Sequence, residues 1–212
     1  MEVAYKKSHV RIAYFLCASW IIATLFAFWW FQFKNLHEFN SLSISTRADF
    51  LPKSLRTELE DKVKSEFPYL FKTKKPVVIH LQATGCGCNR FNNPHLSDVV
   101  STYRRKGVVF ASLVLTRTPQ AIIEKFKENT GIESILQNQS LQFALENVSS
   151  PAALVFDGNG ELSYFGPYSS GAMCSTQSGQ YVETSLDSLL SEKKTDLAPD
   201  KAFGCFCAWK KT

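Results

Sequence analysis

Residues 77–89, with the sequence VVIHLQATGCGCN, decide the fold. They begin with an apolar run, 77–81, that lies between a proline and a glycine and predicts a buried strand. The strand leads into a glycine-containing turn that carries Cys86 and Cys88. Two thiols are therefore expected at the point where a buried strand ends.

A helix is expected directly after this turn. Asn93 and Pro94 have the character of a helix cap and a first-turn proline, and residues 95–100 continue as a helix. Both cysteines should then lie just before the N-terminus of the helix. Unpaired N–H groups and the helix dipole favour a thiolate in that position.

The N-terminal segment predicts one transmembrane helix. Residues 12–33 carry no charge and match the ~20 residues that cross a hydrocarbon core. No small-X-small cleavage site follows, so we expect an uncleaved anchor rather than a signal peptide. Lys6, Lys7 and Arg11 precede the span and only Lys34 follows it closely. The positive-inside rule therefore places the N-terminus in the cytoplasm and the remaining chain in the periplasm, where disulfides persist.

Composition and charge fit one domain with appendages. The chain has 212 residues, 45% of them apolar, and a net charge of +5 that is small and scattered. No basic stripe indicates nucleic acid as a partner. The expected organisation is a cytoplasmic tip and anchor (1–34), a tether (35–52), a folded domain (53–192) and a cysteine-bearing tail (193–212).

The folded domain reads as alternating strands and helices. Leucine, valine and phenylalanine at every fourth position predict a helix over 53–67. Glycines between two apolar runs predict a hairpin around 157–160. The other expected elements are strand 76–83, a helix to about 107, strand 108–115, helix 118–129, an ambiguous segment 136–148 that favours a helix around LQFALEN (141–147), strands 151–156 and 161–166, and helix 179–192.

This order of elements resembles the thioredoxin-like superfamily over residues 74–192, and membrane-anchored bacterial members are the most similar group. The resemblance implies an α/β fold with a mixed sheet flanked by helices, here preceded by one transmembrane helix. It implies a cis peptide at Ser150–Pro151 and makes Cys86 the exposed nucleophile. The family's usual Cys-X-X-Cys is Cys-X-Cys here, because Asn89 stands where the second cysteine would be.

The sulfur that pairs with Cys86 has three candidates. Cys88 would close a small, strained ring. Cys174 follows the last predicted strand, in a loop that the resemblance brings near the cysteine turn. Cys205 and Cys207 lie in the tail, which is long enough to fold back and has aromatic residues with which to dock.

His80 lies in the first strand, on the face opposite Ile79 and Leu81. Thioredoxin-like proteins commonly have a buried acid at the matching place, which assists proton transfer to the second sulfur. The resemblance therefore implies the same role for His80, whose unperturbed pKa lies near the operating pH. A histidine buried in the core for packing alone is the alternative.

These features predict a thiol–disulfide oxidoreductase or redox sensor, anchored by a single pass in the bacterial inner membrane. Its partners would be protein thiols or disulfides, and its expected site combines Cys86, Cys88, His80 and Pro151 with Cys174, Cys205 or Cys207. No cofactor is required. Two alternatives stay open: a Cu or Zn site formed by the two Cys-X-Cys pairs, and a non-catalytic interaction domain stapled by disulfides.

Overall fold

The computed structural model describes residues 2–39, 53–83, 85–145, 148–169, 180–191 and 202–209. The chain divides into two compact units, Met1–Leu36 and His37–Thr212. The first unit is the helix α1 (Glu2–Asn35). Its segment His9–Trp30 has a mean hydropathy of 1.9 over 22 residues, so it is long and apolar enough to cross a membrane. All side chains described in that segment are exposed.

The second unit is built on a five-stranded mixed sheet of order β4-β3-β2-β6-β7. Its central strand β2 pairs with β3 in parallel, and β3 pairs with β4 in parallel. On the other side, β6 pairs antiparallel with β2, and β7 pairs antiparallel with β6. The strands are β2 (Val77–Gln82), β3 (Val109–Val114), β4 (Ser134–Leu136), β6 (Ala152–Phe156) and β7 (Leu162–Gly166). Every residue of β2 is buried, as expected for a central strand covered on both faces.

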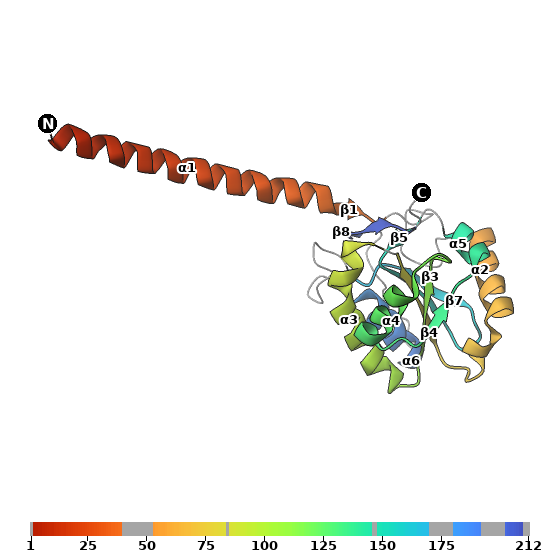
Figure 1. The fold of residues 1–212 in the computed structure, drawn as a ribbon. Coiled ribbons are helices and arrows are strands. Elements are labelled where there is room, and N and C mark those ends of the chain that lie inside the picture. The colour runs from red at the N-terminus through yellow and green to blue at the C-terminus, as the bar shows by residue number, and fades with distance from the viewer. Residues whose placement is uncertain are drawn as a thin grey trace. The chain divides into compact units, whose positions relative to one another are not determined.

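Helices cover both faces of this sheet (Figure 1). They are α2 (Lys53–Glu66), the short 3₁₀ helix η2 (Pro68–Phe71), α3 (Gly87–Arg104), α4 (Gln120–Thr130), α5 (Gln139–Ala144) and α6 (Tyr181–Ser191). In Figure 1, α3, α4 and α6 lie on one side and α2 and α5 on the other. The strand order, the helix layers and the cis peptide Ser150–Pro151 confirm the thioredoxin-like fold.

One strand was not expected, and it ends where the ambiguous segment 136–148 begins; the helix favoured within that segment forms. β4 forms the sheet edge beside β3, and α5 follows it with Asn138 as its N-cap. The side chain of Asn138 accepts a hydrogen bond from the Leu141 amide at 2.9 Å, which satisfies one of the unpaired donors of the first turn. The predicted hairpin forms between β6 and β7.

The helix α3 begins earlier than its sequence indicated. Cys86 is its N-cap and Gly87 its first residue, so Pro94 lies inside the helix and does not open it. A proline inside a helix removes one backbone hydrogen bond, and its ring crowds the carbonyl four residues earlier. The first turns are held by the buried side chains of Cys88 and Asn89. The cysteines therefore occupy the N-cap and the first turn and do not precede the helix.

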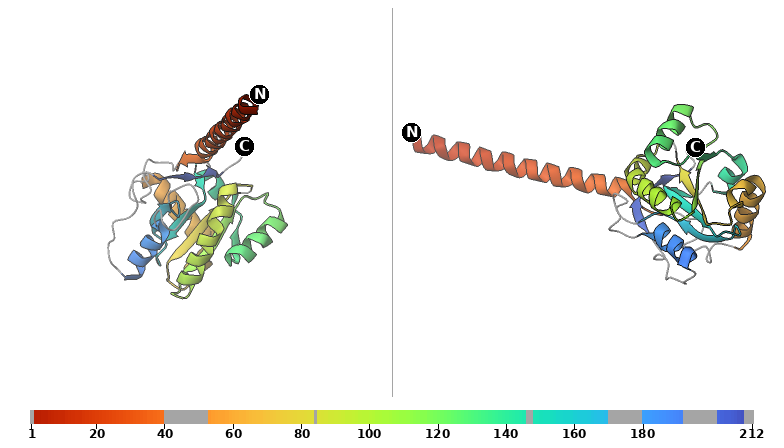
Figure 2. Two further views of the ribbon diagram at one scale, coloured as in Figure 1. Left: turned by 90° about the vertical axis from the view of Figure 1, so that its left-hand side faces the viewer. Right: turned by 90° about the horizontal axis from the view of Figure 1, so that it is seen from below.

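The C-terminal tail forms two short strands against distant parts of the chain. β8 (Phe203–Cys205) pairs with β1 (Leu36–Glu38), and β9 (Cys207–Ala208) pairs with β5 (Ser149–Ser150). β1 thus comes from the stretch predicted as a tether. Figure 2 shows the dark-blue tail strands at the end of the domain where α3 begins. The tail is therefore part of the folded unit in residues 202–209.

Candidate functional site: a cluster of four cysteines

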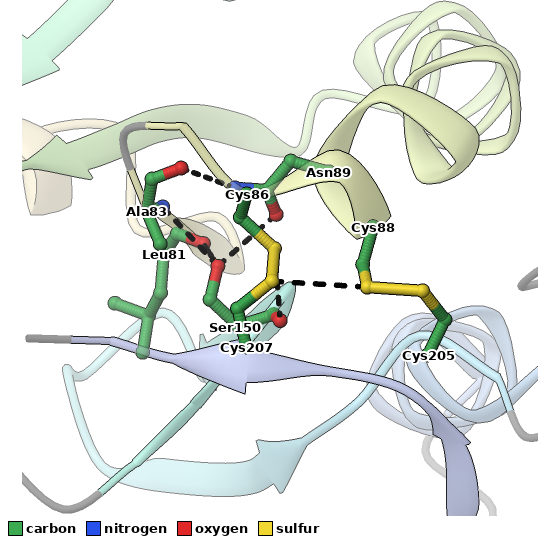
Figure 3. The surroundings of a disulfide bond; sticks show 8 residues. All are labelled: Leu81, Ala83, Cys86, Cys88, Asn89, Ser150, Cys205 and Cys207. Atoms are coloured by element: carbon green, nitrogen blue, oxygen red, sulfur yellow. Dashed lines mark hydrogen bonds between the residues drawn. A yellow bond between two sulfur atoms is a disulfide. The ribbon is translucent and has the colours of Figure 1, made fainter. Parts of the chain in front are cut away.

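Two disulfides join the start of α3 to the tail. Cys86 is bonded to Cys207 and Cys88 to Cys205, with Cα–Cα distances of 6.0 and 5.4 Å (Figure 3). The bonds connect residues that are 121 and 117 positions apart in the sequence. Of the three candidate partners for Cys86, the structure thus pairs it with the tail and forms no ring with Cys88.

Cys86 lies where three segments meet. It caps α3, its amide donates to the Ala83 carbonyl at 3.4 Å, and its sulfur lies 3.8 Å from the Ser150 carbonyl oxygen. Ser150 precedes Pro151, so Cys86 contacts the segment that contains the cis peptide. The side chain is partly buried. A thiolate at this N-cap would be stabilised by the unpaired amides and the dipole of an 18-residue helix.

Asn89 and Ser150 form the polar support beneath the sulfurs. The Asn89 Nδ2 donates to the Ala83 carbonyl at 2.8 Å. The Ser150 hydroxyl lies 3.0 Å from the Asn89 Oδ1 and 2.9 Å from the Leu81 carbonyl, and it accepts from the Ala83 amide. A hydroxyl has one proton, so these two acceptors share it. Asn89 therefore ties the first turn of α3 to the end of β2 and to the residue before Pro151 (Figure 3).

The two disulfides are in contact with each other. The sulfurs of Cys207 and Cys88 are 3.8 Å apart, and those of Cys86, Cys88 and Cys207 lie within 4.8 Å of one another. Cys88 and Cys205 are 7% and 6% exposed, whereas Cys86 and Cys207 are partly exposed. A reagent from solvent therefore reaches the Cys86–Cys207 pair more easily than the Cys88–Cys205 pair.

Non-covalent contacts also hold the tail. Trp209 is completely buried, and its amide donates to the Val148 carbonyl at 2.8 Å. Phe206 is buried and packs edge-on against Phe39, with ring centroids 5.2 Å apart. The Phe39 amide donates to the Ala202 carbonyl at 2.8 Å. These contacts position both tail cysteines independently of their sulfur bonds.

His80 is completely buried in β2, with both ring nitrogens occupied. Nδ1 lies 3.1 Å from the Tyr168 hydroxyl, Nε2 lies 3.1 Å from the Gln82 Oε1, and the ring stacks on Phe126. Burial lowers the pKa of His80 to about 4, opposed only in part by the bond to Gln82. The imidazole is therefore neutral at neutral pH, with Nε2 donating to Gln82 and Nδ1 accepting from Tyr168.

His95 is a buried polar residue of α3 that was not among the predicted site residues. Its side chain is 5% exposed, and its Nε2 lies 2.5 Å from the Glu183 Oε1. The signal was present in the spacing, because Asn92, His95 and Val99 share one helical face that packs inward. The pair joins α3 to α6 and so fixes the helix that carries the cysteines.

The remaining candidates are distributed as follows. Pro151 lies between β5 and β6, directly after the residue that contacts the Cys86 sulfur. Cys17 is free and exposed in α1. Cys174 lies outside the described residues.

Comparison with known families places this domain. The family described as a domain of unknown function, DUF6436, matches residues 56–209. The chain belongs to this family. The match extends through Cys205 and Cys207, so the DUF6436 region includes both cysteine pairs and the docked tail. No curated protein matches the chain.

Solved structures share the fold at low sequence identity. A hypothetical protein from Sinorhizobium meliloti is 16% identical, with 82% of this chain and 98% of that chain covered at a TM-score of 0.54. An uncharacterized conserved protein from Geobacillus kaustophilus is 17% identical, with 66% and 78% covered at a TM-score of 0.52. A thioredoxin-like protein in the oxidized form is 21% identical, with 57% and 81% covered at a TM-score of 0.44. The fold assignment for this DUF6436 member depends on its own strand order and helix layers.

Proposed function

We propose that this protein is a membrane-anchored thiol–disulfide exchange protein in which Cys86 is the nucleophile and Cys207 is its resolving partner. The observation that carries the proposal is the position of Cys86. It caps α3, contacts the carbonyl of the residue before Pro151 and is bonded to a partly exposed tail cysteine. A sulfur that is both reachable and stabilised as a thiolate is what exchange requires.

The exchange step follows from the accessibility of the outer pair. A thiolate of a partner dithiol attacks the Cys86 sulfur, a partner–Cys86 disulfide forms, and Cys207 leaves as a thiolate. The second thiol of the partner then attacks its own sulfur in the mixed disulfide and releases Cys86 as a thiolate. The partner departs as a disulfide and this protein gains two electrons. Stabilisation of the Cys86 thiolate at the helix N-terminus favours its release from the mixed disulfide.

The buried pair can then be reached from inside the protein. A Cys207 thiolate lies close enough to attack Cys88, since their sulfurs are 3.8 Å apart in the oxidised protein. That attack forms a Cys88–Cys207 bond, breaks the Cys88–Cys205 bond and releases Cys205 as a thiolate. Attack by the Cys86 thiolate on Cys207 then re-forms the Cys86–Cys207 bond and releases Cys88 as a thiolate. The 3.8 Å contact therefore supports a route by which an electron pair moves from the reduced outer pair to the buried disulfide.

The proposed setting is the periplasmic side of a bacterial inner membrane. The apolar helix segment His9–Trp30 supports a single-pass anchor. Lys6, Lys7 and Arg11 support a cytoplasmic N-terminus by the positive-inside rule. In that orientation the four cysteines face an oxidising compartment, in which their disulfides persist.

Turnover with a generic disulfide substrate tests the proposal. The full-length protein in detergent is assayed for reduction of insulin by dithiothreitol, beside the variants Cys86→Ser and Cys17→Ser. We expect the rate of insulin reduction with Cys86→Ser to be at least tenfold lower than with the wild type. The rate with Cys17→Ser should equal that of the wild type. Alkylation and mass analysis at increasing reductant should show the Cys86–Cys207 bond opening before the Cys88–Cys205 bond.

Two results would contradict the proposal. Unchanged turnover in Cys86→Ser would remove this sulfur from the reaction. If both bonds stayed closed in a reductant that opens insulin disulfides, the cysteines would serve to staple the tail, as in the non-catalytic interaction domain.

A further inference from the structure

Four sulfurs gather at one place, and three of them, those of Cys86, Cys88 and Cys207, lie close enough together to share a metal ion. In a Zn²⁺ site with metal–sulfur bonds near 2.3 Å, neighbouring sulfurs are ~3.8 Å apart. The sulfurs of Cys88 and Cys207, which share no bond, are already 3.8 Å apart, and Cys86 completes a group within 4.8 Å. Cys205, bonded to Cys88, brings a fourth sulfur to the same place.

We infer that the protein binds one Zn²⁺ through Cys86, Cys88, Cys205 and Cys207 when both disulfides are reduced. This inference depends on the gathered sulfurs and holds whether or not the protein exchanges disulfides with a partner. The same four atoms would then have two states, two disulfides or one metal centre.

The tail should stay in place after reduction, which keeps the four thiols together. Trp209 is fully buried and hydrogen bonded through its amide to Val148. β9 pairs with β5, so Cys207 remains opposite Ser150 without help from its sulfur. Phe206 remains packed against Phe39. Reduction lengthens two sulfur–sulfur separations from bonding distance to ~3.8 Å, which side-chain rotation at four cysteines can supply.

Reduction of the disulfides and binding of Zn²⁺ need one added reactant, an external reductant. Each disulfide takes up two electrons and two protons from an external reductant, which gives four thiols. Binding of Zn²⁺ by four thiols releases four protons and leaves a site with a net charge of −2. The N-terminus of α3, where Cys86 and Cys88 lie, offers unpaired amides and a positive dipole end to that charge. Sulfur-only ligation selects a thiophilic ion such as Zn²⁺ over Mg²⁺ or Ca²⁺.

Zinc content and cobalt spectroscopy of the full-length protein test the inference. The protein in detergent is reduced anaerobically with a phosphine, incubated with ZnCl₂, passed through a desalting column and measured for zinc per chain. We expect about one Zn²⁺ per reduced chain and none above background in the oxidised protein. Co²⁺ in place of Zn²⁺ should give thiolate-to-metal charge-transfer bands and the visible bands of a tetrahedral site.

Variants identify the ligands. Cys86→Ser, Cys88→Ser, Cys205→Ser and Cys207→Ser should each weaken zinc binding at least tenfold and alter the cobalt spectrum. The matched control is Cys17→Ser with Cys174→Ser, which removes the other two cysteines and should keep one Zn²⁺ per chain. In that control background, zinc should also protect four thiols from alkylation.

Two outcomes would overturn the inference. The first is a fully reduced wild-type chain, with its thiols counted by alkylation, that retains no zinc. The second is full zinc retention in a Cys205→Ser/Cys207→Ser variant, which would place the metal elsewhere. Either result leaves the dithiothreitol-dependent reduction of insulin by the wild-type protein unaffected, so the two proposals fail separately.

Discussion

Cys207 lies directly opposite Ser150 in the antiparallel pairing of β9 with β5. The residue before Pro151 and the cysteine bonded to Cys86 are therefore register partners. This pairing fixes the backbone of the tail across the mouth of the cysteine turn, and the sulfur bond is formed within that arrangement. The strand pairing and the buried tail side chains should therefore outlast reduction.

Removal of the Trp209 ring should detach the reduced tail. Trp209→Ala empties a fully buried site, a change that typically costs about 3–5 kcal/mol. We expect Cys205 and Cys207 of the reduced, full-length variant to react with iodoacetamide at least tenfold faster than in the wild type. Trp209→Phe should stay close to the wild type, because the indole Nε1 has no hydrogen-bond partner in the described part of the chain. Equal alkylation rates for Trp209→Ala and the wild type would show that this ring does not hold the tail.

Asn89→Ala should destabilise the domain through its hydrogen bonds. The substitution leaves the buried Ala83 carbonyl without the Asn89 donor and withdraws one of the acceptors of the Ser150 hydroxyl. Such losses cost about 1–3 kcal/mol in the free energy of unfolding. Urea unfolding of the oxidised protein checks this, with the exposed Ser101→Ala expected within about 0.5 kcal/mol of the wild type. A stability of Asn89→Ala equal to that control would mean that water replaces the lost contacts.

Two glycines should respond oppositely to alanine. A Cβ at Gly158 would lie 2.3 Å from the Lys74 carbonyl oxygen, so backbone must move and Gly158→Ala should cost about 1–3 kcal/mol. A Cβ at Gly87 meets nothing within 4 Å and extends the start of α3. Gly87→Ala should therefore add about 0.4–1 kcal/mol. Thermal unfolding of both variants measures their stability against the wild type. A Gly87→Ala variant less stable than the wild type would contradict the open space at the start of α3.

His80 should make stability fall in mild acid. Its folded-state pKa is lowered from 6.5 to about 4, so the unfolded chain takes up a proton that the folded chain refuses. Stability from the neutral imidazole is complete above about pH 6.5 and is lost as the pH falls toward 4, by at most about 3 kcal/mol. Other groups titrate in this range, so the measurement is the difference in unfolding free energy between wild type and His80→Gln. That difference should shift in favour of the variant as the pH falls. A difference that does not change with pH would contradict the lowered pKa.

The fold was accessible from the sequence because its signals are local. The buried run that forms β2 and the glycine turn between β6 and β7 are decided by neighbouring residues, and both elements form as predicted. The start of α3 was misplaced because Pro94 is a strong local signal, whereas Cys88 and Asn89 at the start of the helix contact the distant residues Cys205 and Ser150.

The connectivity of the site could not be derived from spacing. Six cysteines allow many pairings, and the choice is made by β9 pairing with β5, an interaction between segments far apart in the chain. The partner of His95 likewise could not be found from spacing, because Glu183 lies 88 residues away. Aromatic residues in the tail did indicate docking, and Phe206 and Trp209 are buried.

The long span of both disulfides bears on how the protein is made. Cys86 and Cys88 leave the ribosome more than a hundred residues before the cysteines to which they are bonded. During that interval the sheet can assemble while both thiols have no native partner. An oxidising enzyme that acts on the emerging chain could join them only to each other, to another cysteine of the chain or to a foreign sulfur. Correct bonding therefore has to wait until Cys205 and Cys207 have emerged, or be repaired by an isomerase.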